Sequence, residues 1–334
     1  MKLEKELAKV GIHPICEISY GEKMNIARQA ATKIAGAFSC LQNQYSEILI
    51  RLSNCKMYLA EIENPAEKVN YFYKDKAIYF NKEVDYQKIG EATLHECLHF
   101  LQDSRNINGE LNRLGLCRFS EFRVSGLGLN EGATQYIASV ANGGECHKAI
   151  RSGDSFFTFY TVNENYYPLL TSIFKQLLVL LGEERLIEST VNGRADFNDY
   201  FLNLFEENTN KLLTKMDDLM EMENAQKEIP EEAKILTYLD IQDLILTTYF
   251  SKASKYADTL EEIEQEKGKL ENLQKILGKT DNKNSEAICE EMNRTLNHRY
   301  IQISRQKSKN SLVVFYQSKI MKFLQRILSY LGEK

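Results

Sequence analysis

Proline is so scarce in this chain that little in the sequence interrupts helices. The chain has four prolines and 17 glycines in 334 residues. Proline removes a backbone donor and breaks a helix interior, so a chain with few prolines can form long helices. Residues 22–54, 130–141 and 168–181 place apolar side chains at the three-to-four-residue spacing of amphipathic helices, and the chain after Gly193 is rich in helix formers. We therefore expect a predominantly α-helical protein.

Short strands are expected in one part of the sequence. Residues 57–62, 69–74 and 77–81 are rich in tyrosine, isoleucine, valine and phenylalanine, which is typical of strands. Asp75-Lys76 separates the last two runs and suits a tight hairpin. A helix is expected to follow, from Asp85 to Asp103.

The order of these elements predicts an α+β fold with three parts. A polar loop that contains glycines is expected over residues 104–128, between two helices. We divide the chain into a helical N-terminal segment (1–56), a core that begins with a small β-sheet (57–182) and a helical C-terminal region (183–334).

Charge and cysteine content argue against several classes of protein. A net charge of −5 argues against nucleic-acid binding by the chain as a whole. Seven cysteines without a Cys-x-x-Cys pair do not fit a secreted disulfide framework. The longest apolar stretch among the charged N-terminal residues is too short for the core of a signal peptide, and no apolar run reaches the roughly 18 residues of a transmembrane helix. We expect a cytoplasmic protein, although a chain exported without a leader would look the same.

The strongest chemical signal is the segment His95-Glu96-Cys97-Leu98-His99. Residues four apart on a helix lie one turn apart on one face, so both imidazoles can reach one metal ion. Glu96 lies beside them, where it can bind a water rather than the metal. The apolar stripe of this helix is centred about 130° from the histidines, so they are not simply core residues. His95 and His99 are therefore candidate zinc ligands, whereas Cys97 is expected in the core.

A zinc site of this type needs a third ligand and leaves the fourth position for water. Glu131 is the preferred candidate, because it opens a helix whose apolar face can pack beside the first helix. The structural alternative is that Glu131 only stabilises the N-terminus of its own helix. Gln135, one turn later, could orient a ligand through a hydrogen bond. The other candidate ligands are Asp103, Glu110, Glu121, Glu145 and His147.

A histidine pair of this kind, followed by Asn130-Glu131-Gly132 at the start of a second helix, resembles the gluzincin group of zinc metallopeptidases. The resemblance covers residues 57–182 and implies a zincin-like core, a bound zinc ion and hydrolysis of peptide bonds. The chain departs from thermolysin-like members because 31 residues separate His99 from Glu131, a longer gap than theirs. In zincins a strand before the motif helix forms the sheet edge over the cleft. Residues 77–81 are therefore expected to be an edge strand that an extended peptide can pair with, although a plain structural hairpin is equally compatible with these residues.

The resemblance also implies a mechanism. Zinc held by His95, His99 and Glu131 would lower the pKa of a water, and Glu96 would accept its proton as the water attacks the scissile carbonyl. Such enzymes usually add a tyrosine, histidine or arginine that stabilises the oxyanion. Tyr167, at a predicted helix start, is the preferred candidate for this catalytic role. The other candidates are Arg123, His147 and Tyr166.

The C-terminal residues differ in charge from the rest of the chain. Residues 294–334 contain nine Lys or Arg and one Glu, a net charge of +8, which leaves −13 for the remainder. Residues 311–331 have the pattern of a basic amphipathic helix, which could contact a membrane surface or an acidic partner. Their high apolar content favours the alternative, a helix packed on the body with its basic face toward the acidic residues 216–232.

The predicted function is zinc-dependent hydrolysis of a peptide or protein substrate, with no nucleic-acid partner. The alternative is a non-catalytic helical interaction or scaffold protein with a relic metal site. The two differ at Glu96, because the substitution Glu96→Gln would abolish turnover in the enzyme and change nothing measurable in the scaffold.

Overall fold

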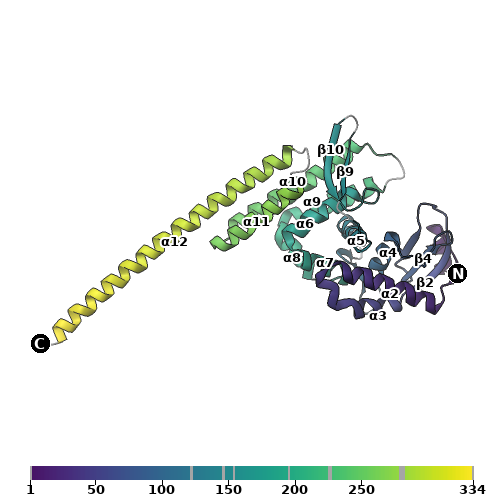
Figure 1. Cartoon of the computed structure of the whole chain (residues 1–334), viewed down its shortest axis with the longest axis horizontal. Helices are drawn as coiled ribbons and strands as arrows, with labels where there is room; N and C mark the ends of the chain where they lie inside the picture. The colour runs from purple at the N-terminus through teal and green to yellow at the C-terminus, as the bar shows by residue number, and fades with distance from the viewer. Residues whose placement is uncertain are drawn as a thin grey trace.

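The computed structural model describes residues 2–120, 123–144, 147–152, 155–194, 196–224, 228–277 and 283–332. They form a mainly helical α+β structure, as the sequence predicts (Figure 1). The α-helices are α1 (Lys2–Lys9), α2 (Tyr20–Ala37), α3 (Tyr45–Ser53), α4 (Glu91–Gln102), α5 (Leu127–Ala141), α6 (Pro168–Leu181), α7 (Glu183–Asn192), α8 (Asp196–Phe205), α9 (Thr209–Glu223), α10 (Glu231–Tyr256), α11 (Leu260–Leu277) and α12 (Lys283–Gly332). The 3-10 helices are η1 (Ser39–Gln44) and η2 (Glu206–Asn208). The strands are β1 (Ile12–Glu17), β2 (Lys56–Ile62), β3 (Val69–Phe72), β4 (Ala77–Asn81), β5 (Asp103–Arg105), β6 (Leu111–Leu114), β7 (Cys117–Ser120), β8 (Arg123–Ser125), β9 (His147–Ser152) and β10 (Ser155–Thr161).

A four-stranded mixed sheet lies in the N-terminal part, with the strand order β1-β2-β4-β3. Strands β2 and β4 are parallel, and the other neighbours are antiparallel. Side chains alternate along β4, so Ile78 and Phe80 join the main core with α2 and α4. Ala77 and Tyr79 join a smaller cluster with Leu7 of α1 on the other face. Both faces of the sheet are therefore covered.

One expectation about this sheet is wrong. Residues 77–81 were expected at the edge, but β4 lies between β2 and β3, and all five of its residues are buried. The edge strand beside β4 is β3, and β3 packs against α4. Residues 1–56, expected to be a helical segment, are mostly helical but also contain β1, which pairs with β2. Five of the six residues of β1 are exposed, so it has no apolar alternation that would mark it as a strand.

Residues 104–128 were expected to form a loop, and this is also wrong in part. They contain most of a second four-stranded sheet, an antiparallel meander in the order β5-β6-β7-β8. Its strands have three or four residues and are mostly polar, for example Leu-Asn-Arg-Leu in β6. Such short polar strands carry no periodic signal, because pairing with neighbours rather than a buried face defines them. A separate hairpin of β9 and β10 follows α5.

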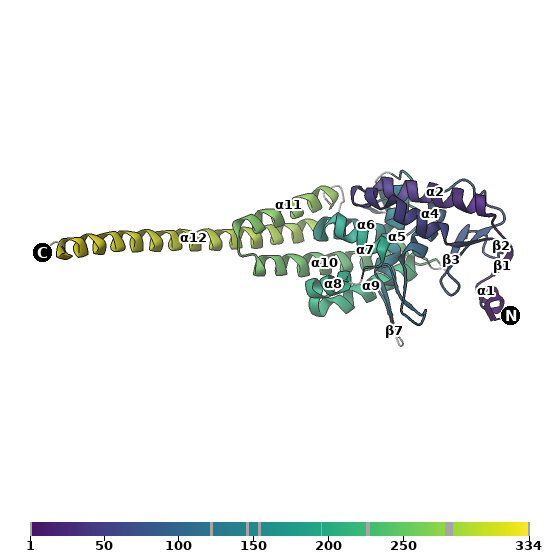
Figure 2. The same ribbon diagram turned by 90° about the horizontal axis from the view of Figure 1, so that it is seen from below.

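The central helix of the body is α5. Helices α2, α4, α6, α7 and α9 all pack against it, and Figure 2 shows it enclosed by its neighbours. One hydrophobic cluster extends from Ile18 to Ile303 and includes residues of all three predicted regions. The division at residues 56 and 182 stays a prediction. The buried position of α5 matters for function, because Glu131 lies on it.

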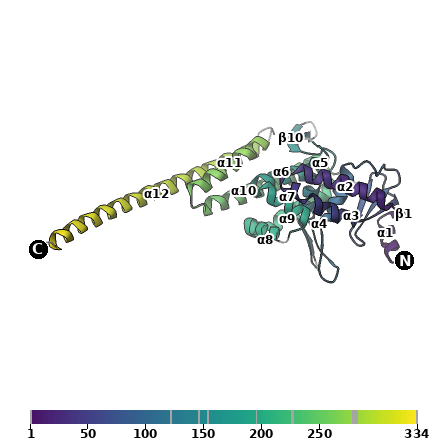
Figure 3. The ribbon, with the colours of Figure 1, turned by 60° about the horizontal axis from the view of Figure 1, so that its bottom comes forward.

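The C-terminal helices form an extension of the body. Helix α12 packs on α10 and α11 in its first part, and its last buried side chain among those described is Ile303. Figures 1, 2 and 3 agree that the rest of α12 projects away from the other elements. The expected packing of residues 311–331 on the acidic segment is therefore wrong, since α12 continues along the axis that α10 and α11 set. Among the described residues, no helix has the length and apolar content needed to cross a membrane.

Candidate metal centre

The two histidines lie on α4, which begins at Glu91 rather than at Asp85 as expected. Both belong to the middle of the helix, one turn apart, and their ring centroids are 4.6 Å apart. Their side chains are only 11% and 9% exposed, respectively. Buried imidazoles require partners for their nitrogen atoms, so the groups around them define what the site can do.

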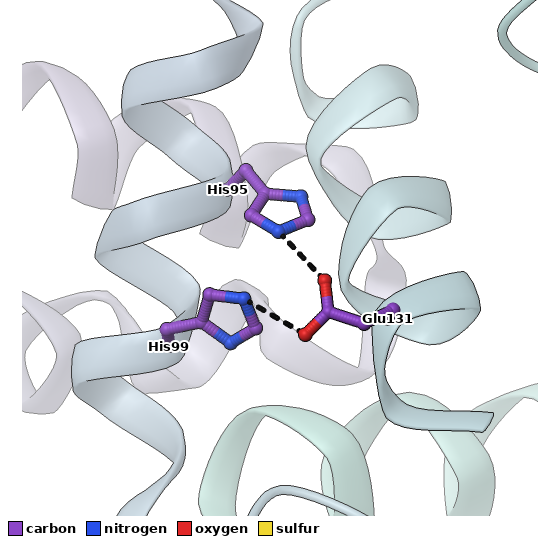
Figure 4. Close-up of side chains that lie close together, drawn as sticks. All are labelled: His95, His99 and Glu131. Carbon is purple, nitrogen blue, oxygen red and sulfur yellow. Dashed lines mark ion pairs between the residues drawn. The ribbon is translucent and has the colours of Figure 1, made fainter. Parts of the chain in front are cut away.

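Glu131 projects from α5 toward both histidines, as Figure 4 shows. Its Oε2 lies 3.2 Å from Nε2 of His95, and its Oε1 lies 3.3 Å from Nε2 of His99. One ligand atom of each of the three residues lies within 4.8 Å of the others. The structure thus brings together the three residues that the sequence singles out as metal ligands. Two imidazole nitrogens and a carboxylate are a ligand set that zinc uses.

The remaining candidate ligands do not join this cluster where the structure describes them. Asp103 is buried in β5, where it accepts hydrogen bonds from Tyr71 and Arg105 and pairs with Lys76. Glu110 accepts a hydrogen bond from Asn106 in an exposed turn. Glu121 and Glu145 lie outside the described residues, and so do the side chains of His147 and Arg123.

His95 is oriented by a chain of hydrogen bonds that ends in a carboxylate. Its Nδ1 lies 3.0 Å from Oε1 of Gln135. The Nε2 of Gln135 donates to Glu91, which as a carboxylate can only accept. The amide of Gln135 therefore turns its oxygen toward His95, and Nδ1 of His95 must donate to it. In the neutral ring the lone pair is then on Nε2, the atom that faces Glu131.

Glu91 accepts from three side chains in all. Besides Gln135, its Oε1 accepts from the hydroxyl of Ser139 at 2.7 Å and from the amide of Asn163. Ser139 belongs to α5 and Asn163 to the segment after β10. One carboxylate at the first turn of α4 thus joins three parts of the chain behind His95.

His99 is oriented by neutral groups instead. Its Nδ1 lies 3.1 Å from Oε1 of Gln102, which also accepts from Nδ2 of Asn130 at 3.1 Å. The Nε2 of Gln102 donates to the hydroxyl of Thr134 at 2.8 Å. As with His95, an amide oxygen faces Nδ1, so the lone pair of the neutral ring of His99 is on Nε2.

Asn130 connects this network to the second sheet. Its Oδ1 accepts from the backbone N–H of Leu116 at 3.0 Å. Gly115, just before it, has φ +55°, and a Cβ there would lie 2.2 Å from Oδ1 of Asn130. Only glycine fits at this turn, because both the backbone conformation and the space exclude a side chain. The β6–β7 turn therefore fixes the residue that precedes Glu131.

The charges of the three residues are strongly coupled. Burial alone would favour neutral His99, but the carboxylate of Glu131 beside it raises the pKa of His99 to about 9. Burial would likewise raise the pKa of Glu131, but the two imidazoles lower it well below its usual range. Without a metal ion the cluster is held together by shared protons, and a divalent cation can replace them.

Glu96 lies on the side of α4 that faces the edge strand. Its Oε2 accepts from the backbone N–H of Tyr71 in β3 at 2.7 Å. Burial raises the pKa of Glu96, although His95, His99 and this hydrogen bond oppose the shift. A carboxylate with a raised pKa is suited to accept and release a proton near neutral pH.

The two tyrosines before Pro168 differ in environment. Tyr166 is 53% exposed. Tyr167 is mostly covered, and its φ of 49° and ψ of 47° place it in the left-handed region as the residue before α6. Burial and the nearby charges of Glu131, Glu223 and Glu96 raise the pKa of Tyr167 well above its usual value. Its hydroxyl therefore stays protonated and can act as a donor.

Cys97 is a core residue, as expected. It is fully buried. Burial and the charge of Glu96 raise the pKa of its thiol to about 12, which leaves it without nucleophilic thiolate at neutral pH.

Comparison of the chain with family models, with curated proteins and with solved structures finds no match. Any function for this protein therefore rests on its own residues and their geometry.

Sequence reasoning anticipates Gln135 as a partner of a ligand but misses Glu91, Gln102 and Asn163. Gln102 has a detectable signal, because it lies next to Leu98 on the apolar stripe of α4, where a polar side chain needs a buried partner. Glu91 and Asn163 have none, since 72 positions separate them and only the fold brings them together.

Proposed function

We propose that this protein is a zinc-dependent metallopeptidase that hydrolyses peptide bonds. The observation that carries the proposal is the convergence of His95, His99 and Glu131, with ligand atoms within 4.8 Å of one another. The resemblance of the motifs to those of gluzincins supports the same reading. The donor set of two imidazoles and one carboxylate leaves a fourth position for water, which is typical of catalytic rather than structural zinc.

The ring orientations fit zinc as well as the ligand types do. In both imidazoles Nδ1 is hydrogen-bonded to a glutamine oxygen, and Nε2 faces the centre. The carboxylate of Glu131 supplies a negative charge that partly neutralises the cation. Zinc bound to these three residues would supply a Lewis acid that lowers the pKa of a water toward neutrality.

Glu96 is the proposed general base. Its carboxylate is held by the N–H of Tyr71 at 2.7 Å, and burial raises its pKa. In the proposed reaction Glu96 accepts a proton from the water that attacks the scissile carbonyl, and then gives it to the leaving amine. The C–N bond breaks and a carboxylic acid and an amine leave, so the step needs no other reactant.

Tyr167 is the proposed donor to the oxyanion. It lies near the negative charges of Glu131 and Glu96, which together with burial keep its hydroxyl protonated. A protonated hydroxyl can stabilise the oxygen that becomes negative as water adds to the carbonyl.

Metal content tests the proposal first. Protein purified without added metal, and a His99→Ala variant, are analysed by mass spectrometry for bound metals. The expected result is near one zinc per chain in the parent and none in the variant. A folded parent that contains no zinc and binds none when it is added would exclude the peptidase.

Turnover separates the enzyme from the scaffold alternative. Parent and Glu96→Gln are incubated with an unfolded protein and with a peptide mixture, and new amine groups are measured. We expect Glu96→Gln to lose at least about 100-fold in rate while it retains zinc. Zinc-loaded parent that cleaves nothing, or a variant that cleaves as fast as the parent, would favour the non-catalytic protein.

A further inference from the structure

Helix α9 packs against α5, which carries Glu131, and against α6, which follows Tyr167. It presents a carboxylate to the N-terminus of each. Asp217 accepts from the backbone N–H of Gly128 at 2.7 Å. Glu223 accepts from the N–H of Leu169 at 2.8 Å and of Leu170 at 3.2 Å.

Neither of these helices has a cap of its own. The residue before α5 is Gly126, which has no side chain, and Tyr167 before α6 makes no capping hydrogen bond. The first N–H groups of a helix have no partner within it and carry a partial positive charge. The two carboxylates of α9 therefore supply from another helix what a serine or aspartate usually supplies locally.

Close backbone contacts connect the hydrogen bonds of Asp217 and Glu223 to the position of Glu131. A Cβ at Gly128 would lie 2.1 Å from the carbonyl oxygen of Met216, so α5 and α9 touch directly beside Asp217. A Cβ at Gly132 would lie 3.0 Å from the carbonyl oxygen of Leu170, so α5 and α6 touch directly beside Glu223. Glu131 thus lies between two contacts that α9 controls.

We propose that Asp217 and Glu223 are positioning residues of the metal centre, which hold the first turns of α5 and α6 and thereby place Glu131 and Tyr167 relative to the histidines of α4. Asp217 acts on Glu131 through the start of α5. Glu223 acts on Tyr167 through the start of α6, and on Glu131 only through the Leu170–Gly132 contact. The role assigned to Tyr167 rests on the proposed function, whereas the placement of Glu131 is measurable as metal binding alone.

The experiment compares Asp217→Ala and Glu223→Ala with the matched variants Asp218→Ala and Glu221→Ala. The two control positions are exposed acidic residues of the same helix, so each control removes an acidic side chain from α9 without removing the hydrogen bonds to α5 and α6. Zinc affinity is measured by competition with a chelator. The visible spectrum of the cobalt-loaded protein reports the geometry of the ligands, which a loss of general stability does not change.

Asp217→Ala is expected to weaken zinc binding about 10-fold or more and to alter the cobalt spectrum, because partners behind a ligand commonly contribute that much. Glu223→Ala is expected to weaken it less, and both controls not at all. Asp217→Asn keeps one acceptor oxygen and the side-chain volume, so it should lie between the parent and Asp217→Ala. It replaces Asp217→Ala in the comparison if that variant does not fold.

The experiment distinguishes failure of the proposed function from failure of the positioning role. A parent that binds neither zinc nor cobalt contradicts the proposed function. A parent that binds both, with Asp217 variants that match it in affinity and spectrum, overturns the positioning role and leaves the proposed function intact.

Discussion

Both histidines of the candidate metal centre are tied to helix α5, but by hydrogen-bond networks that differ in charge. His95 is backed by Gln135 and then by the charged Glu91, which also holds Ser139 and Asn163. His99 is backed by Gln102, whose other partners are neutral. One of these is Asn130, the residue before Glu131.

The hydrogen bonds behind His95 end in the carboxylate of Glu91. A negative charge behind an imidazole makes that imidazole a stronger metal ligand. The network behind His99 is neutral and includes Asn130, so it joins His99 to the residue before Glu131. Loss of the charge behind His95 is therefore expected to weaken zinc binding more than loss of the neutral contacts behind His99.

The largest effect is expected at Glu91. The substitution Glu91→Ala removes the acceptor of three donors and lets the amide of Gln135 turn its N–H₂ toward His95. Zinc affinity should fall by about 10- to 100-fold, as measured by chelator competition. Glu83→Ala, which removes an exposed acid before α4, is the control and should bind zinc like the parent. A zinc affinity of Glu91→Ala equal to that of the parent would show that the hydrogen bonds behind His95 contribute nothing to zinc binding.

A smaller effect is expected at Gln102. The substitution Gln102→Met keeps the side-chain volume but removes the oxygen that His99 and Asn130 share, and we expect zinc affinity to fall by about 10-fold. Gln176→Met is a matched control, since Gln176 is equally buried but bonds to Tyr238 and Gln242. It should lower the thermal unfolding temperature without changing zinc affinity. A similar loss of affinity in both variants would mean that burial, not the contact with His99, matters.

The smallest effect is a dependence on pH that comes from His99. Its pKa is raised from 6.5 to about 9 in the metal-free fold. The charged form of His99 therefore contributes stability that is fully present below pH 6.5 and is lost as the pH rises to about 9. Thermal unfolding of the metal-free protein should show this decline between pH 6.5 and 9, and His99→Gln should reduce it. Over the same range zinc should bind more tightly, because it competes with the proton. An unfolding temperature that rises in this window would contradict the assignment.

The sequence identifies the three clustered residues better than it predicts their surroundings. His95, His99 and Glu131 can be singled out because helical spacing and zinc chemistry both restrict the choice. Their neighbours depend on tertiary contacts, such as the one between Glu91 and Asn163, for which no local pattern exists. The role of Gln102 is partly predictable, because its polar side chain lies on the apolar stripe of α4.

The fold shows the same difference between features that local sequence predicts and features that depend on tertiary contacts. The helices follow from periodicity, although the start of α4 is six residues later than expected. The order of strands does not follow, because it depends on pairing across the chain. Residues 77–81 are a strand as predicted, but β4 pairs with β2 on one side and with β3 on the other, so β4 lies inside the sheet and β3 is the edge strand.

The long projecting helix has a consequence for how the molecule moves in water. Helix α12 has 50 residues, and at 1.5 Å per residue it is about 75 Å long. A compact chain of this size has a radius of gyration of only about 20 Å. A single copy should therefore tumble and diffuse like a larger particle, and it should elute from a sizing column ahead of globular standards of 38.6 kDa. Its mass in solution is better measured by light scattering than by elution volume.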